Sequence, residues 1–144
     1  MSNPVQIKFF FDINDPKFFS KTIIVNDTPG KYVSHVFIKC PIYTKDSNGN
    51  KSQIGYKVSD DYVQQVDADK YSVRIHNTYY LNNYGTINWE YSFLNRKPEV
   101  FYPVNKIAAS NITSTTGSYL GAKGYVRLLP TADGLRKVKI ILHR

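Results

Sequence analysis

The sequence contains a single cysteine, Cys40, so no disulfide can form within the chain. Cys40 ends the apolar run 36–40, where we interpret it as a buried structural thiol rather than a reactive nucleophile. Helical periodicity is nearly absent, and apolar runs contain only a few residues, against the roughly 20 that span a membrane. With 144 residues, the chain can bury a core without a disulfide or a metal.

Motifs for common catalytic and cofactor chemistry are also missing. The three histidines, His35, His76 and His143, show no metal-ligand spacing. The glycine-rich segment 116–124 lacks the Gly-Lys-Ser/Thr motif and the following helix of a phosphate-binding loop. We therefore expect no metal and no cofactor. Because no charged and apolar leader precedes the first strand, we expect a cytoplasmic or virion protein with no membrane partner.

Positive charge is abundant but dispersed. Lys and Arg number 19 against 11 Asp and Glu, which gives a net charge of +8. Such an excess allows attraction to nucleic acid or other polyanions. However, no four basic residues are consecutive, and Lys137 and Lys139 alternate with apolar neighbours, as on the solvent face of a strand.

Alternation of apolar and polar residues dominates the sequence and predicts strands. Every odd position from Val5 to Ile13 is apolar, and Asn48-Gly49 predicts a type I′ hairpin turn. The other expected strands lie at about residues 31–43, 52–58, 71–81, 86–93, 125–129 and 138–142. Without any linker or repeat, residues 1–144 are predicted to form one all-β domain. A closed antiparallel barrel is favoured because closure leaves no exposed edge strand.

The glycine-rich segment also carries a family resemblance. Residues 116–128, Thr-Gly-Ser-Tyr-Leu-Gly-Ala-Lys-Gly-Tyr-Val-Arg-Leu, resemble a stretch of allene oxide cyclases and dirigent proteins. Residues 9–14, 53–56 and 71–93 resemble three other pieces of that family, in the same order. The resemblance implies an eight-stranded barrel around an apolar cavity, and a homo-oligomer that is often a trimer. A divergent member of the family is therefore predicted.

The residues discussed for the cyclases are only partly present. The resemblance places Asp12 at the family's first-strand glutamate and Asn14 at its asparagine. The cysteine falls near Asp61, and the tyrosine falls at Phe93, which has no hydroxyl. Two of the four groups are therefore chemically changed, and allene oxide cyclase activity is not expected.

The pocket of such a barrel has several candidate residues. Asp12 matches the acidic residue in the first strand of dirigent proteins, but alternation puts it opposite the apolar face, so a solvated or capping role and a pocket acid both remain open. The stripe of Trp89, Tyr91 and Phe93 alternates as a barrel lining does. The candidate pocket residues are Asn14, Asp61, Trp89, Tyr91 and Phe93.

Three functions from different classes follow from these observations. The partial loss of the cyclase groups favours a non-enzymatic structural or interaction barrel. A component of a large DNA virus particle is one version, since residues with AT-rich codons are abundant. The alternatives are a barrel that binds a hydrophobic small molecule, or acts as a dirigent-like isomerase with Asp12 as the acid, and a nucleic-acid-binding barrel. A filled interior is expected of the first function, and a cavity of several hundred Å³ of the second.

Overall fold

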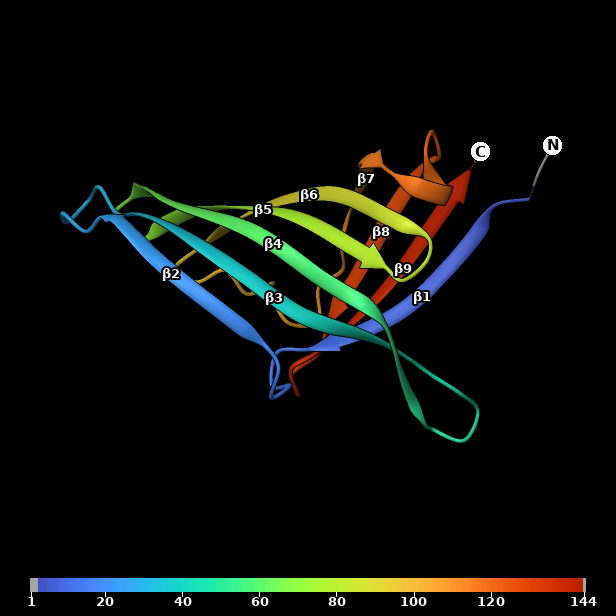
Figure 1. Ribbon diagram of the computed structural model, residues 1–144. Coiled ribbons are helices and arrows are strands. Elements are labelled where there is room, and N and C mark those ends of the chain that lie inside the picture. The colour runs from blue at the N-terminus through green and yellow to red at the C-terminus, as the bar shows by residue number, and fades with distance from the viewer. Residues whose placement is uncertain (1–2, 144) are drawn as a thin grey trace.

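The computed structural model describes residues 3–143, and these form an all-β protein (Figure 1). A three-residue 3-10 turn, η1 (Gly117–Tyr119), is the one helical element among them. The described residues include no helix with the length and apolarity that crossing a membrane requires. The strands are β1 (Val5–Asp12), β2 (Phe19–Asn26), β3 (Val33–Lys45), β4 (Lys51–Asp67), β5 (Lys70–Leu81), β6 (Gly85–Asn95), β7 (Ala108–Thr115), β8 (Lys123–Pro130) and β9 (Leu135–His143).

Eight of the strands close into an antiparallel barrel. Their order is β1-β9-β8-β7-β6-β5-β4-β3, and the circle is completed where Phe10 of β1 pairs with Tyr43 of β3. β2 pairs with the first half of β3, from Val33 to Lys39. β1 and β2 therefore lie along the same edge of β3, and β1 pairs with it at Tyr43. The expected closed eight-stranded antiparallel barrel is therefore confirmed, with β2 as an additional strand.

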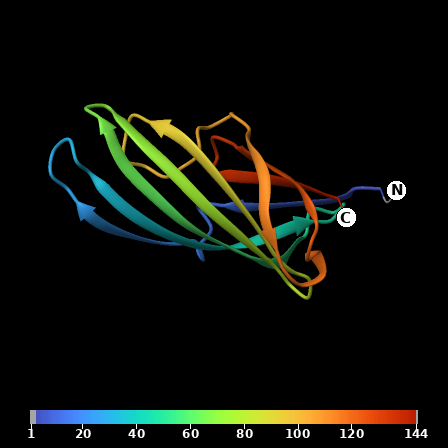
Figure 2. The same cartoon turned by 90° about the horizontal axis from the view of Figure 1, so that it is seen from above.

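The barrel wall is incomplete beside the second half of β6. β5 pairs with β6 along its whole length, whereas β7 pairs only with the part of β6 between Ile87 and Trp89. Residues 96–107, which connect β6 to β7, lie across the remaining opening (Figure 2). We call residues 96–107 the cover segment. Its Val100 and Tyr102 are buried in the barrel core, although the segment forms no strand.

The core follows the alternation expected from the sequence. Phe9 and Phe11 of β1 point inward, as do the odd-numbered apolar residues of β5 and β6. Burial of a large apolar side chain stabilises the fold by about 1.5–3 kcal/mol. The largest side chains with almost no exposed surface are Trp89, Tyr79, Phe11, Ile42, Ile75 and Ile87.

Three strand segments were not expected. β7 lies outside the expected strands. Almost every residue of β2 is exposed, so β2 lacks the alternation that marks a half-buried strand. β4 extends to Asp67, well beyond the expected end at Val58, and this extension has no regular alternation because most of its residues are polar. All three segments are held in place by pairing with neighbouring strands, which local sequence patterns do not encode.

The turn between β3 and β4 also differs from the prediction. Gly49 has a φ of 81°, but Asn48 is not among the residues with positive φ, so the type I′ prediction was wrong. Asp46 Oδ1 instead accepts hydrogen bonds of 2.9 Å from the backbone N–H groups of Asn48 and Asn50. An aspartate side chain that bonds the backbone two residues on stabilises a longer loop.

The glycine-rich segment has the structural role expected of it at Gly117. This residue has a φ of +66°, and a Cβ there would lie 2.3 Å from the backbone oxygen of Tyr84. Any other side chain would therefore collide with the turn between β5 and β6 and strain the backbone. Gly117 allows the connection between β7 and β8 to pack closely against that turn.

Candidate functional site

A cluster of polar residues lies inside the barrel. β4 presents Lys57, Ser59 and Asp61 on its inner face, because side chains two apart in a strand share a face. Asn77 of β5 and Arg136 of β9 also point inward, and each of the five residues is at most 3% exposed. Polar groups buried to this extent are costly unless they are paired, so their concentration requires a physical reason.

Lys57 is the buried cation of this cluster. Its Nζ lies 4.6 Å from the centre of the Phe11 ring, within the range of a cation–π contact. Burial lowers the pKa of Lys57, and the nearby charge of Asp61 partly offsets that effect. Cys40 lies on the inner face of β3, where burial raises its thiol pKa to about 11.

Asp61 is the buried carboxyl group of the cluster. Burial raises its pKa to about 6, and the charge of Lys57 acts in the opposite direction. A carboxyl group with such a pKa is partly protonated near neutral pH and can donate or accept a proton there. The side chain of Ser59 also interacts with this carboxyl group and acts to lower its pKa.

Tyr102 fills the centre of the site from the cover segment. Its ring stacks on Trp89, with 6.4 Å between ring centres and an interplanar angle of 11°. The rings of Tyr91 and Phe93 lie 6.0 and 6.1 Å away. Asn77 Nδ2 donates a hydrogen bond of 2.9 Å to the Tyr102 hydroxyl. Burial raises the pKa of that hydroxyl well above its ordinary value, so it stays neutral.

Unpaired polar atoms also lie in the interior. An unpaired buried polar atom costs about 1–3 kcal/mol, so each one requires a physical reason. Among the described residues, Ser34 Oγ and Asn77 Oδ1 have no hydrogen-bond partner. Ser59 interacts with Asp61, and Trp89 interacts with Tyr79, so these four side chains form two polar pairs.

Little free space remains around this cluster. An enclosed cavity of about 20 Å³ lies between Asp61, Lys57, Arg136 and the cover segment. A ligand site usually needs about 300–1,000 Å³, whereas this cavity has room for about one water molecule. With Val100 and Tyr102 in place, the barrel is therefore filled.

The structure places the two predicted first-strand residues at one end of the barrel. Asp12 ends β1 on the face opposite to the buried Phe11, and its Oδ1 accepts a hydrogen bond of 2.8 Å from the backbone N–H of Asn14. The side chain of Asn14 donates to the backbone oxygen of Asp133. Both residues thus hold the loop after β1 against the turn between β8 and β9.

The other predicted residues lie in the barrel interior. Asp61 and Trp89 are buried, and Tyr91 and Phe93 are half-buried where β6 meets the cover segment. The three aromatic residues surround the ring of Tyr102, and Asp61 lines the small cavity beside it.

Five residues of the site were not predicted. Asn77 interrupts the apolar odd positions of β5, and Arg136 shares a face with Val138, so alternation alone would have placed both inward. Lys57 and Ser59 flank the apolar Val58, so local alternation would place them outward, and Tyr102 lies outside any strand. For these three, the sequence carries no signal of burial.

The described residues contain no group of three or more His, Cys, Asp or Glu side chains positioned to hold a metal ion. Two of the histidines pair with carboxylates on the outer wall. His35 Nε2 lies 3.1 Å from Asp60, and His76 Nδ1 lies 2.7 Å from Glu90. The chemistry available inside the barrel is therefore that of hydrogen bonds, a buried carboxyl group, a buried ammonium group and stacking rings.

Comparison with known proteins bears on the fold. No protein-family model matches the chain, and no curated protein matches it. Among solved structures, the chain is similar to a pyocyanin demethylase, with 16% identity and a TM-score of 0.61 over 96% of this chain and 100% of that one. The two share a barrel-type fold. At this identity the likeness carries no function, and membership of the allene oxide cyclase and dirigent family stays a prediction.

Proposed function

We propose that the chain is a non-enzymatic barrel that binds a small planar hydroxyaromatic molecule in the place that Tyr102 now occupies. The observation that carries this proposal is the position of Tyr102. Its phenol ring enters the barrel from the cover segment, stacks on Trp89 and receives a hydrogen bond from Asn77. The site is thus complementary to a phenol that the chain supplies itself.

The cover segment is suited to being displaced. Its backbone forms no strand, and most of its residues are exposed, including Phe101 and Val104 at 44% and 49%. Segments with few buried contacts and no strand pairing open at a low free-energy cost. A ligand that reproduces the ring and hydroxyl of Tyr102 would replace its contacts while Tyr102 moves outward.

An unpaired polar atom supports a ligand larger than a phenol ring. Asn77 Oδ1 is a buried acceptor without a partner. A second polar substituent on the ligand would satisfy this atom, and the gain would offset part of the cost of displacing the cover segment. A small-molecule role also agrees with the fold, since one barrel of this fold is named a pyocyanin demethylase.

Binding of 2-naphthol to the wild-type protein tests the proposal. Trp89 is the one tryptophan of the chain and lies in the site, so its emission should be quenched in a saturable way. Naphthalene, which lacks the hydroxyl, should bind more weakly, because Asn77 Nδ2 is then left unpaired. Replacement of Asn77 by Leu should remove this preference for 2-naphthol.

Two variants of the cover segment test whether 2-naphthol binds in the barrel interior or on the protein surface. Tyr102→Ala should tighten 2-naphthol binding by about tenfold or more, since no side chain has to leave the site. Val104→Ala, an exposed change in the same segment, should leave the affinity unchanged. If the wild type fails to bind and only Tyr102→Ala does, the interior is a filled core with an engineered cavity, and the proposal is wrong.

The competing function is the structural or interaction module expected from the sequence, of which a virion component is one version. That function accounts for the filled barrel but not for the unpaired polar atoms inside it. A native mass spectrum of the protein from its own source separates the two. One small adduct per chain supports ligand binding, whereas a bare homo-oligomer, such as the trimer implied by the family resemblance, supports the module.

A further inference from the structure

A row of positive charges crosses the outer wall of the barrel. Lys8 of β1 lies directly opposite Lys139 of β9, and Lys139 lies directly opposite Arg127 of β8. Neighbouring strands are about 5 Å apart, so the three cations share one line across the sheet. Like charges directly opposite each other destabilise a sheet, and here the wall contains two such pairs in succession.

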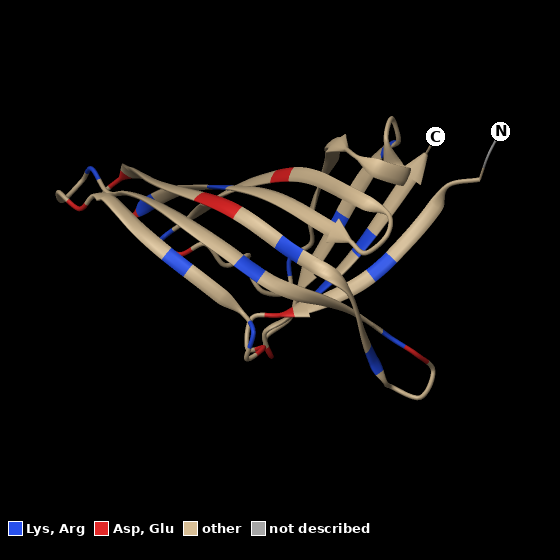
Figure 3. Cartoon of the chain, viewed as in Figure 1, with Lys and Arg blue, Asp and Glu red and all other residues tan. Residues whose placement is uncertain are grey.

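This row lies in a groove. The groove has a volume of about 710 Å³, and its floor is formed by β1, β9 and β8. Lys137 and Lys45 add two more cations, and no Asp or Glu lines it. Figure 3 shows the same asymmetry, with bands of basic residues and no acidic ones on β8 and β9.

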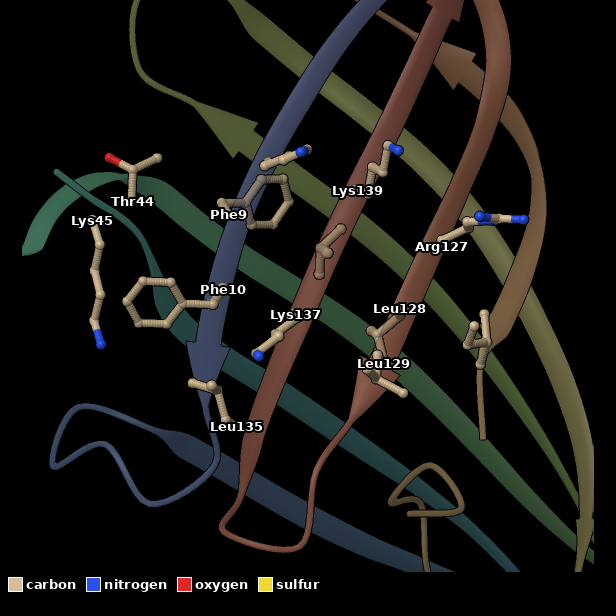
Figure 4. Close-up of a pocket in the computed structure, with 13 residues that line it drawn as sticks. Phe9, Phe10, Thr44, Lys45, Arg127, Leu128, Leu129, Leu135, Lys137 and Lys139 are labelled. Carbon is tan, nitrogen blue, oxygen red and sulfur yellow. The ribbon is translucent and has the colours of Figure 1, made fainter. Parts of the chain in front are cut away.

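Flat apolar surface lies next to the cations. Figure 4 shows Phe10 projecting from β1 at the edge of the groove, with Lys45 on the neighbouring strand. Lys45 Nζ lies 5.4 Å from the centre of the Phe10 ring, and that ring lies 5.9 Å from the ring of Tyr43. Further along β8, just outside the groove, the ring of Tyr125 lies 5.9 Å from the Arg127 guanidinium.

From this arrangement we propose that the groove over β1, β9 and β8 binds single-stranded nucleic acid. A line of cations matches a chain of phosphates, and the ring of Phe10 at the edge of the groove and that of Tyr125 just beyond it offer faces on which unpaired bases stack. An acidic peptide would match the cations, but it has no bases that could stack on the rings. A duplex presents its phosphates but keeps its bases stacked inside. The site is on the outer wall, so it is independent of ligand binding in the barrel interior.

Fluorescence anisotropy with labelled oligothymidylate of about 20 nucleotides tests the proposal, a length that exceeds the roughly 4–16 nucleotides covered by one small barrel. Affinity should fall with salt, with a slope of roughly 0.7 in log–log units for each phosphate contacted. The variant with Lys8, Lys137 and Lys139 changed to Gln should lose about tenfold or more in affinity, and its salt slope should fall by about 2.

A matched control separates the groove from net charge. Changing Lys21, Lys39 and Lys70 to Gln removes the same charge from exposed positions on β2, β3 and β5. This variant should bind nearly as the wild type does. An equal loss in the two triple variants would show that only net charge matters and would overturn the proposal. Thermal unfolding of both variants checks that they fold. If the triple variant of the groove does not fold, the exposed single change Lys137→Gln replaces it in the binding experiment.

Competition experiments and substitution of the aromatic residues test which kind of molecule the groove binds. Polyglutamate and a duplex of the same length should both compete poorly, and Phe10→Leu together with Tyr125→Leu should weaken oligothymidylate binding by several-fold. Equal competition by polyglutamate, with no effect of the ring changes, would assign the groove to an acidic protein. Tighter binding of the duplex would likewise exclude a single-stranded site.

Discussion

Asn77 Nδ2 and the hydroxyl of Tyr102 are joined by a hydrogen bond of 2.9 Å that links the barrel wall to the cover segment. Within residues 3–143, it is the one hydrogen bond between β5 and the cover segment, and Asn77 and Tyr102 are both almost completely buried. Its strength therefore sets how firmly the cover segment is held over the interior.

Removal of the Tyr102 hydroxyl should weaken the fold. Tyr102→Phe leaves Asn77 Nδ2 buried without an acceptor, which costs about 1–3 kcal/mol in the free energy of unfolding. Urea denaturation followed by Trp89 emission measures the loss. Tyr62→Phe is the control, because Tyr62 is 46% exposed and its hydroxyl can bond water. Equal stability of Tyr102→Phe and the wild type would mean that this bond does not hold the cover.

Asp61 should make the protein less stable as pH rises. Its folded pKa of about 6 lies above the ordinary value of an aspartate, about 3.9, so the folded state holds the proton more tightly than the unfolded state does. The resulting stabilisation is complete below about pH 4 and is lost as pH rises through 6, a change of up to about 3 kcal/mol.

The variant Asp61→Asn isolates this effect. It carries no titrating group at the site, so its stability relative to the wild type should increase between pH 4 and pH 7. Urea denaturation at several pH values measures the difference. Asp69→Asn, at an exposed position in the turn between β4 and β5, is the control. A constant difference between Asp61→Asn and the wild type across this range would contradict the raised pKa.

Relief of the positive row should stabilise the barrel. Lys139 lies between Lys8 and Arg127, so Lys139→Thr removes two repulsions between directly opposite cations. The free energy of unfolding should rise by about 0.2–1 kcal/mol at low salt, and the gain should shrink as salt screens the charges. Lys21→Thr, which replaces a lysine opposite Phe37, should show no such gain. A gain that is independent of salt would point to β propensity rather than charge.

Gly117 should tolerate no side chain. At Gly117→Ala the new Cβ would lie 2.3 Å from the backbone oxygen of Tyr84, in addition to the strain of a positive φ. Gly121→Ala isolates the second effect, since Gly121 has a φ of +81° but no atom within 4 Å of the added Cβ. Thermal unfolding should show a modest loss for Gly121→Ala, on the order of 1 kcal/mol, and a clearly larger loss for Gly117→Ala. Similar losses would mean that the turn at Tyr84 can move away.

Much of the barrel could be predicted from local patterns. Alternation marked β1, β5 and β6, each of which has one buried face and one solvent-exposed face. Most residues expected to face inward are buried or half-buried, whereas Val5 at the start of β1 is 52% exposed. β2 gave no such signal, because its side chains are exposed on both faces and its place depends on pairing with β3. The site could be predicted only in part. Alternation identified Trp89 as inward-facing, but it could not indicate that Tyr102 would stack on it.

The sequence by itself determined that this protein is a β-barrel, because the period of two in its apolar residues leaves each strand with one face to bury. Only the tertiary structure decided what the barrel contains. Lys57 and Asp61 are buried because β4 continues into a closed wall, and Tyr102 enters the barrel because β7 leaves half of β6 unpaired. The line of Lys8, Lys139 and Arg127 arises in the same way, since it joins three strands whose register is set by closure of the sheet. Contacts between residues so distant along the chain depend on strand order and register, and no local pattern specifies either one.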